Sequence, residues 1–265
     1  MYFNLNRRAF FAVTALCLTS LTALEATAAA DVLPSTIAGK GELAIGLEST
    51  YPPFNFQDES GNLVGFEVDF ANDLCKRLGL TPRYVPTQFD GILAALASGR
   101  LDVVINQITI TPERQKNYDF SVPYTITKIQ MVTRKELAAE LTAPEKLSGR
   151  AVGAVLGTNF EQWVRANVPD ADVKTYDLDA TMYRDLKAGR IDVALNDTMV
   201  AASLIKKADS GFVTAGEPFA PQEQAVAMRK EPALKAAIDK AIEEMKADGT
   251  LTAMSIKWLG VDVSK

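Results

Sequence analysis

The chain carries one short pattern twice, and this repeat constrains the fold more than any other feature of the sequence. GRLDVVINQ begins at Gly99, and GRIDVALND begins at Gly189, ninety residues later. An interval of this size is too long for the unit of a solenoid and indicates two similar lobes. In each copy the apolar residues lead into polar ones, Gln107 and Thr109 in the first and Asp197 in the second. The repeat predicts two lobes that each supply one wall of a ligand cleft, although convergent use of Gly and branched residues in helix-turn-strand units would give a similar pattern.

Strand-like and helix-like segments alternate along the chain. Phe66, Phe70 and Leu74 recur at helical spacing, and Gly79 follows as a stop signal. Alternation of this kind is typical of α/β units with parallel sheets, which bind ligands beyond the carboxyl ends of their strands. The expected strands are 42–48, 83–86, 101–106, 149–157, 172–177 and 191–197, and the expected helices are 65–79, 89–99, 111–118, 159–167, 180–189 and 199–208, before a final strand and two amphipathic helices between 223 and 260.

The first thirty residues have the pattern of an export signal. Arg7 and Arg8 precede an apolar run over 9–24, and Ala28-x-Ala30 has the form of a cleavage site. We therefore expect residues 1–30 to be a cleaved signal peptide and the rest of the chain to be periplasmic. A twin-arginine signal and a retained membrane anchor are alternatives, and the apolar run is short for a membrane span.

Composition excludes several classes of chemistry. The chain has no histidine, which removes Ser-His-Asp and Cys-His catalysis and His-ligated metal sites. Its net charge of -5, without a basic stripe, argues against nucleic acid as a partner. Cys75 is the only cysteine beyond residue 30, so no intramolecular disulfide is expected there, and its apolar neighbours favour a buried side chain. Cys17 would allow a lipid anchor, but Leu16 before it suits lipoprotein cleavage poorly. We expect no metal and no cofactor.

Several longer motifs resemble those of the amino-acid-binding proteins of ABC importers, which are solute-binding protein family 3. They are STYPPFNF, GNLVGFEVDFANDLCKRLG, FDGILAALASGRLDVVINQITITPERQKNYDFSVPY, VGAVLGTNFEQWVRANV and EMKADGTLTAMSIKWLG. Together they span nearly all of the chain beyond the signal. Within the family the sequence looks most like the periplasmic L-cystine-binding proteins.

The resemblance implies a two-lobed periplasmic-binding-protein fold of type II. Each lobe would be a mixed, mainly parallel sheet flanked by helices, and two hinge strands would join the lobes. The family's chain order assigns 31–126 together with 223–265 to lobe one and 128–221 to lobe two. Each lobe then contains one copy of the repeat.

The resemblance also implies how an α-amino acid would be held. Arg114 matches the family's carboxylate-binding arginine, although an Arg in a first helical turn is usually a solvated surface residue. Thr158 and Asn159 would bring a helix N-terminus to the same carboxylate, beside a simple capping role. Asp197 would bind the ammonium, and it would equally suit a helix N-cap. Gln107, through its carbonyl group, and Thr109, through its hydroxyl group, would complete the ammonium site.

Three further residues would surround the ligand side chain. Tyr51 and Phe89 match the family's aromatic pair, although isolated aromatic residues are usually core residues. The cystine-binding proteins more often have Trp where this chain has Phe89. Glu48 is a candidate partner for a second, distal ammonium group.

These features predict a binding protein and not an enzyme. We expect it to capture a polar L-amino acid, with L-cystine as the first choice, by hinge closure, and to deliver it as a monomer to the permease subunits of an ABC importer. Glutamine, arginine and glutamate are alternative ligands. A dehydratase acting on cyclohexadienyl substrates or arogenate is the alternative on the same fold.

Overall fold

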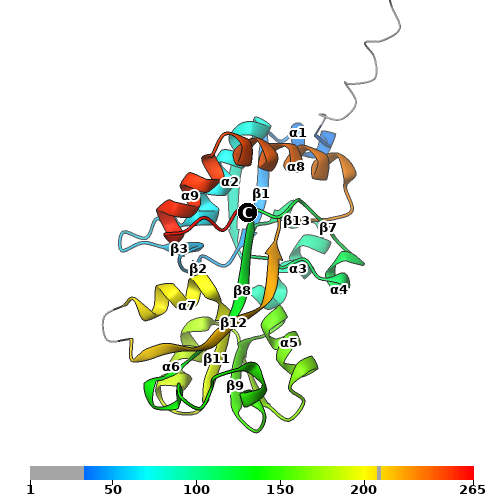
Figure 1. Cartoon of the computed structure of the whole chain (residues 1–265). Coiled ribbons are helices and arrows are strands. Elements are labelled where there is room, and N and C mark those ends of the chain that lie inside the picture. The colour runs from blue at the N-terminus through cyan, green and yellow to red at the C-terminus, as the bar shows by residue number, and fades with distance from the viewer. Residues whose placement is uncertain (1–32, 208–209) are drawn as a thin grey trace, which may run out of the picture.

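The computed structural model describes residues 33–207 and 210–265, which form two α/β lobes joined by two long strands (Figure 1). The predicted signal peptide, residues 1–30, lies outside the described residues. Among the described residues, none of the helices combines the length and the apolar character that a membrane crossing requires.

The elements of the first lobe come from both ends of the chain. They are α1 (Ser35–Ala38), β1 (Glu42–Leu47), β2 (Thr50–Tyr51), β3 (Asn55–Gln57), β4 (Leu63–Val64), α2 (Phe66–Leu78), β5 (Thr81–Pro86), α3 (Phe89–Ala97), β6 (Val103–Val104), α4 (Pro112–Gln115), β7 (Asp119–Phe120), β13 (Ala227–Met228), α8 (Pro232–Ala247) and α9 (Thr250–Leu259).

The elements of the second lobe are continuous in sequence. They are β8 (Thr125–Arg134), the short 3₁₀ helices η1 (Lys135–Leu137) and η2 (Pro144–Leu147), β9 (Ala151–Val155), α5 (Asn159–Asn167), β10 (Asp172–Tyr176), α6 (Asp179–Lys187), β11 (Val193–Asp197), α7 (Thr198–Ile205) and β12 (Phe212–Gln224).

The sheets of the two lobes share one strand arrangement. In the first, β1 lies between the parallel strands β5 and β6, and β13 pairs antiparallel with β6 and β7. In the second, β9 lies between the parallel strands β10 and β11, and β8 pairs antiparallel with β11 and β12. The prediction of two lobes with mixed, mainly parallel sheets is confirmed.

The repeated sequence occupies equivalent positions in these sheets. Asp102 donates its backbone N–H to the carbonyl oxygen of Ala44 (2.8 Å), and its carboxylate accepts the N–H of the same residue (2.9 Å). Asp192 makes the same two contacts with Ala151, at 2.8 and 3.1 Å. The shared Asp therefore anchors the start of β6 to β1 in the first lobe and the start of β11 to β9 in the second.

A glycine in β1 and a glycine in β9, the strand of each sheet that lies between two parallel neighbours, each admit a branched side chain of the repeat. A Cβ atom at Gly46 would lie 2.4 Å from the side chain of Leu101, and one at Gly153 would lie 2.5 Å from that of Ile191. Real side chains do not approach so closely, so each position requires glycine for packing.

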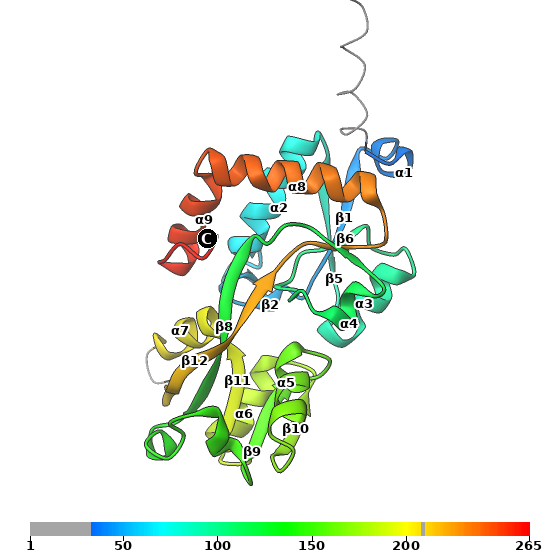
Figure 2. The same cartoon turned by 45° about the vertical axis from the view of Figure 1, so that its right-hand side comes forward.

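Strands β8 and β12 run as an antiparallel pair between the lobes (Figure 2). Their pairing extends from Thr125 and Gln224 near the first lobe to Arg134 and Phe212 in the second, with register shifts around Phe219. The predicted crossings between the lobes, at 126–128 and 221–223, fall within these strands. The exact lobe boundaries remain predictions.

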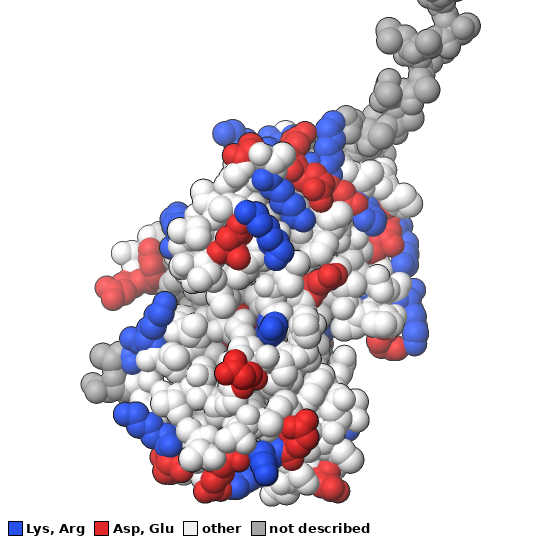
Figure 3. Space-filling view, in the orientation of Figure 1, with Lys and Arg blue, Asp and Glu red and all other residues white. Residues whose placement is uncertain are grey.

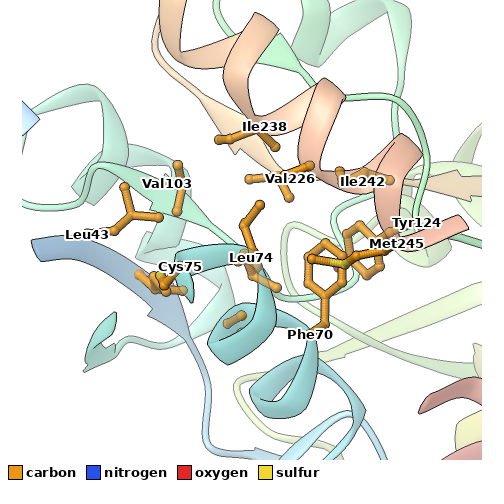
Figure 4. Packing of buried hydrophobic residues seen from close by; sticks show 14 of the residues in the cluster. Leu43, Phe70, Leu74, Cys75, Val103, Tyr124, Val226, Ile238, Ile242 and Met245 are labelled. Carbon is orange, nitrogen blue, oxygen red and sulfur yellow. The ribbon is translucent and has the colours of Figure 1, made fainter. Parts of the chain in front are cut away.

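The core of the first lobe packs around α2 (Figure 4). Phe70, Leu74 and Cys75 are fully buried on this helix, and the chain leaves it through Gly79 in a left-handed conformation, as the sequence predicts. Burial raises the pKa of the Cys75 thiol to about 12. The C-terminal helices, which the resemblance assigns to lobe one, pack against α2, and α8 lies along the side of the first lobe farthest from the second (Figures 1 and 2).

Several predicted elements are shorter in the structure, including the strand expected over 149–157, which is limited to β9. The strand expected over 101–106 is limited to β6, because the side chain of Asn106 takes over the pairing with Glu48 N–H and the backbone turns at Gln107 with a φ of 49°. The helix expected over 111–118 is limited to α4.

On the face shown in Figure 3, acidic and basic side chains are interspersed, without a broad basic surface.

Candidate functional site

A narrow cavity of about 30 Å³ lies between the two lobes, with residues of both in its lining. Eight of the nine predicted site residues line the cavity, and Arg114 lies next to it. The lining residues are Glu48, Thr50, Tyr51, Phe89, Asn106, Gln107, Thr109, Val155, Thr158, Asn159, Phe160, Asp179, Asn196, Asp197 and Gln224.

Arg114 is a buried cation at the end of the cavity that contains Phe89 and Thr109. Only 5% of its surface is exposed, and its guanidinium carbon lies 5.8 Å from the centre of the Phe89 ring. The guanidinium group donates to the carbonyl oxygens of Thr109 (2.9 Å) and Gly157 (3.3 Å), which belong to different lobes. Burial lowers its pKa to about 10. Arg114 is therefore not a solvated surface residue, which was the alternative considered from the sequence.

Thr158 and Asn159 lie on the opposite wall, where α5 begins. Thr158 caps this helix, because its hydroxyl oxygen accepts the N–H of Glu161 (3.3 Å). The side-chain amide of Asn159 donates to the side-chain amide oxygen of Gln222, and the hydroxyl of Thr109 donates to the same oxygen at 3.0 Å. Gln222, on β12, therefore joins the two walls.

Asp197 is the N-cap of α7. Its carboxylate accepts the N–H of Met199 (2.7 Å) and the hydroxyl proton of Thr127. Burial raises its pKa to about 6. The residue caps the helix and also lines the cavity, so the two roles considered from the sequence are compatible.

The two predicted aromatic residues also line the cavity. Tyr51 stacks on Phe54, with ring centres 5.6 Å apart, and its hydroxyl donates to Asn196 of the second lobe at 2.9 Å. Phe89 is the first residue of α3 and is largely buried. The cavity thus has apolar ring surfaces beside its polar groups.

Two further carboxyl groups line the cavity beside Asp197. Glu48 accepts a hydrogen bond from the amide of Asn106 (2.8 Å), and burial raises its pKa to about 7. Asp179, at the start of α6, accepts one from the amide of Asn196 (3.0 Å), and burial raises its pKa to about 6. Each of these two groups comes from a different lobe, and the charge of Asp179 contributes to the raised pKa of Glu48.

Sequence reasoning missed Asp179, three amide residues of the cavity lining (Asn106, Asn196 and Gln224), and Gln222 beside the cavity. Asn106 and Asn196 occupy the same position in the two copies of the repeat, and that identity was the available signal. Gln222 and Gln224 lie on a hinge strand far from any recognised motif, and Asp179 looks like an ordinary residue of a first helical turn.

The cavity is therefore acidic. It is lined by three carboxyl groups, and no Lys or Arg is found among its described lining residues. Within 33–207 and 210–265, no group of three or more His, Cys, Asp or Glu side chains could hold a metal ion. An organic cation suits this lining, and a carboxylate on the same molecule would find Arg114 at one end.

Comparison with known proteins identifies the family. Residues 43–261 match the bacterial extracellular solute-binding proteins, family 3. The chain belongs to this family. Its relatives in the family are binding proteins, and this family 3 protein is accordingly a solute-binding protein and not an enzyme.

Individual relatives of this family 3 protein include both cystine-binding and arginine-binding proteins. It is 48% identical to the L-cystine-binding protein TcyJ of Escherichia coli (strain K12), over 99% of this chain and 98% of that protein. It is similar to the structure of an ancestral arginine-binding protein bound to arginine, with 40% identity and a TM-score of 0.79 over 82% of this chain and 98% of that one. The ancestral amino acid-binding protein AncCDT-1, a precursor of cyclohexadienyl dehydratase, matches with 34% identity and a TM-score of 0.80 over 85% and 98% of the two chains.

Proposed function

We propose that this protein is the solute-binding component of an ABC importer for L-cystine, which it holds in the cavity between the lobes. The observation that carries this proposal is the 48% identity, over nearly the whole of both chains, with an L-cystine-binding protein. The acidic lining supports it, because cystine has two ammonium groups and the cavity has carboxyl groups from both lobes.

One amino-acid unit of the ligand would bind between Arg114 and Asp197. Its carboxylate would pair with the guanidinium of Arg114, whose planar shape suits a bidentate contact. The same carboxylate would accept hydrogen bonds from the N-terminus of α5 at Thr158 and Asn159. Its ammonium would bind Asp197, with the carbonyl oxygen of Gln107 and the hydroxyl of Thr109 as further partners.

The remainder of the ligand would lie between the aromatic rings and the other two carboxyl groups. Tyr51 and Phe89 would enclose the disulfide region, and the second ammonium would approach Glu48 and Asp179. Ligand would bind the first lobe in the open protein, and hinge closure would then add the groups of the second lobe.

The wider setting follows from the family. We propose that residues 1–30 direct export and are removed, and that the protein acts in the periplasm as a monomer. The closed form would present surfaces of both lobes to the permease subunits of the importer. No metal and no cofactor takes part.

Thermal melting with a panel of ligands tests this function. The purified protein is unfolded and refolded to remove carried ligand, and then melted with L-cystine, L-arginine, L-glutamine, L-glutamate or prephenate. A ligand at a hundred times its Kd adds about 2.7 kcal/mol to the free energy of unfolding, which is a shift of several degrees. We expect the largest shift with L-cystine. A larger shift with another amino acid would identify that amino acid, and not cystine, as the ligand. A shift with prephenate alone would contradict the importer function.

A further inference from the structure

Glu67 is a buried carboxylate that lies beneath the cavity without lining it. It is in the first turn of α2, within the GFEVDF motif, and its exposed surface is 0%. The backbone N–H of Gln107 (2.6 Å) and the hydroxyl of Tyr124 (2.5 Å) donate to one carboxylate oxygen, and the amide of Asn55 (2.6 Å) donates to the other. All these donors are neutral. An anion buried in this way is costly unless its hydrogen bonds are complete.

Asn55 extends these contacts to the edge of the cavity. Its amide nitrogen donates to Glu67 and also to the side-chain oxygen of Asn106 (3.0 Å). Its amide oxygen accepts the backbone N–H of Ser49 at 2.8 Å. Asn55 is fully buried and is absent from the cavity lining, so it has no direct route to a ligand.

The two backbone N–H groups held by this pair belong to residues in an unfavourable conformation. Ser49 has a φ of 61° and Gln107 a φ of 49°. Left-handed backbone is disfavoured for residues with a Cβ atom, and it persists where surrounding contacts impose it. Ser49 follows Glu48, and Gln107 follows Asn106, so these two conformations direct the side chains of two cavity residues.

We propose that Glu67 and Asn55 are positioning residues for the ligand site. Together they hold Ser49 and Gln107 in left-handed conformations, and thereby fix Glu48, Asn106 and the carbonyl group of Gln107 around the cavity. The inference rests on the proposed use of this cavity for an amino acid. It assigns a role to Glu67 of the GFEVDF motif and to Asn55 of the YPPFNF motif, neither of which is among the proposed ligand contacts.

The substitution Glu67→Gln tests the pair with little change of shape. One carboxylate oxygen becomes an NH₂ group, which opposes the amide nitrogen of Asn55. Rotating the Asn55 amide to relieve this conflict would turn its nitrogen toward the N–H of Ser49. We expect the affinity for L-cystine, measured by calorimetry, to fall at least tenfold. If the wild-type protein binds L-arginine instead, the same loss is expected in the affinity for L-arginine.

Asp69→Asn is the matched control. Asp69 lies in the same turn of α2, but its carboxylate accepts from Lys257 and Trp258 on the other side of the helix. This variant should bind like the wild-type protein. Failure of the wild-type protein to bind any amino acid would refute the proposed function, whereas equal binding by wild type and Glu67→Gln would refute only this inference.

Ser49→Gly distinguishes positioning from a general loss of packing. Glycine adopts a positive φ without a Cβ penalty, so the double variant with Glu67→Gln should populate the binding conformation more and recover about fivefold in affinity. Asn55→Ala serves as a second background if Glu67→Gln does not fold, as judged from its melting without ligand. If Ser49→Gly restores affinity in neither background, the positioning role is wrong.

Discussion

Arg114 is a buried guanidinium whose hydrogen bonds go to carbonyl groups, and whose pKa is lowered by burial alone. A charge in this position is stabilised when a carboxylate pairs with it. At the scale of one residue, Arg114 is therefore the group most directly suited to an amino-acid carboxylate, and its contacts with both lobes place it where closure would act on the ligand.

The substitution Arg114→Ala should lower the affinity for L-cystine by roughly 2–5 kcal/mol, because the ligand carboxylate would be buried without a charged partner. Calorimetry with cystamine, which lacks carboxylates, separates this effect from damage to the site, since its weaker binding should change little. The exposed Arg165, which pairs with Glu161 on α5, provides the control Arg165→Ala. Equal losses for cystine and cystamine would contradict the assigned role.

At the scale of elements, the repeated Asp predicts matched effects on stability. Asp102 and Asp192 each accept the backbone N–H of the neighbouring strand, but Asp102 is the more buried of the two. Replacing either by Ala leaves that N–H without its acceptor, which costs about 1–3 kcal/mol. Urea unfolding should give the larger loss for Asp102→Ala. The exposed Asp172→Ala should change little, and losses no greater than this control would show that the repeat is not used in this way.

At the scale of elements, some helix and strand bounds could be predicted from the sequence and others could not. Periodicity and stop signals located α2, α5 and β11 closely, because their residues face one core and their ends carry local signals. These signals could not locate the end of β6, because there the side chain of Asn106 replaces the backbone pairing between strands. Gln222 and Asp179 were missed because their importance arises only where β12 and α6 meet residues of the other lobe.

At the scale of the whole molecule, carboxyl groups from both lobes line one cavity, and this predicts a pH dependence. Burial raises the pKa of Glu48 from 4.5 to about 7, and the pKa values of Asp179 and Asp197 from 3.8 to about 6. The ligand-free folded protein therefore binds more protons than the unfolded chain between about pH 4 and pH 7. The stability that these groups contribute is largest below about pH 4 and is lost as the pH rises to about 7.

Ligand affinity should change in the opposite direction. An ammonium group pairs with ionised carboxylates, so the affinity for L-cystine should fall as the pH falls from about 7 to about 5. Calorimetry across this range, with melting of the ligand-free protein in the same buffers, measures both trends. Glu48→Gln should flatten the upper part of each curve, and parallel rather than opposite trends would contradict the account.

The hinge links the two ends of this acidic cavity. The hydroxyl of Thr125 on β8 lies 3.0 Å from the side-chain amide oxygens of both Gln107 of the first lobe and Gln224 of β12, which share its one proton. Gln224 then donates to Thr127 (2.7 Å), and Thr127 donates to Asp197 of the second lobe. The strands that join the lobes therefore carry polar side chains that connect one wall of the site to the other.

The burial of Cys75 bears on the chemistry of the proposed cargo. Cystine contains a disulfide, and a thiolate that reached it would break that bond and form a mixed disulfide with the protein. Cys75 is enclosed in the core of the first lobe (Figure 4), and the raised pKa of its thiol leaves almost no thiolate at neutral pH. A carrier of this construction would not exchange sulfur with an oxidised ligand, and would release it in the redox state in which it was captured.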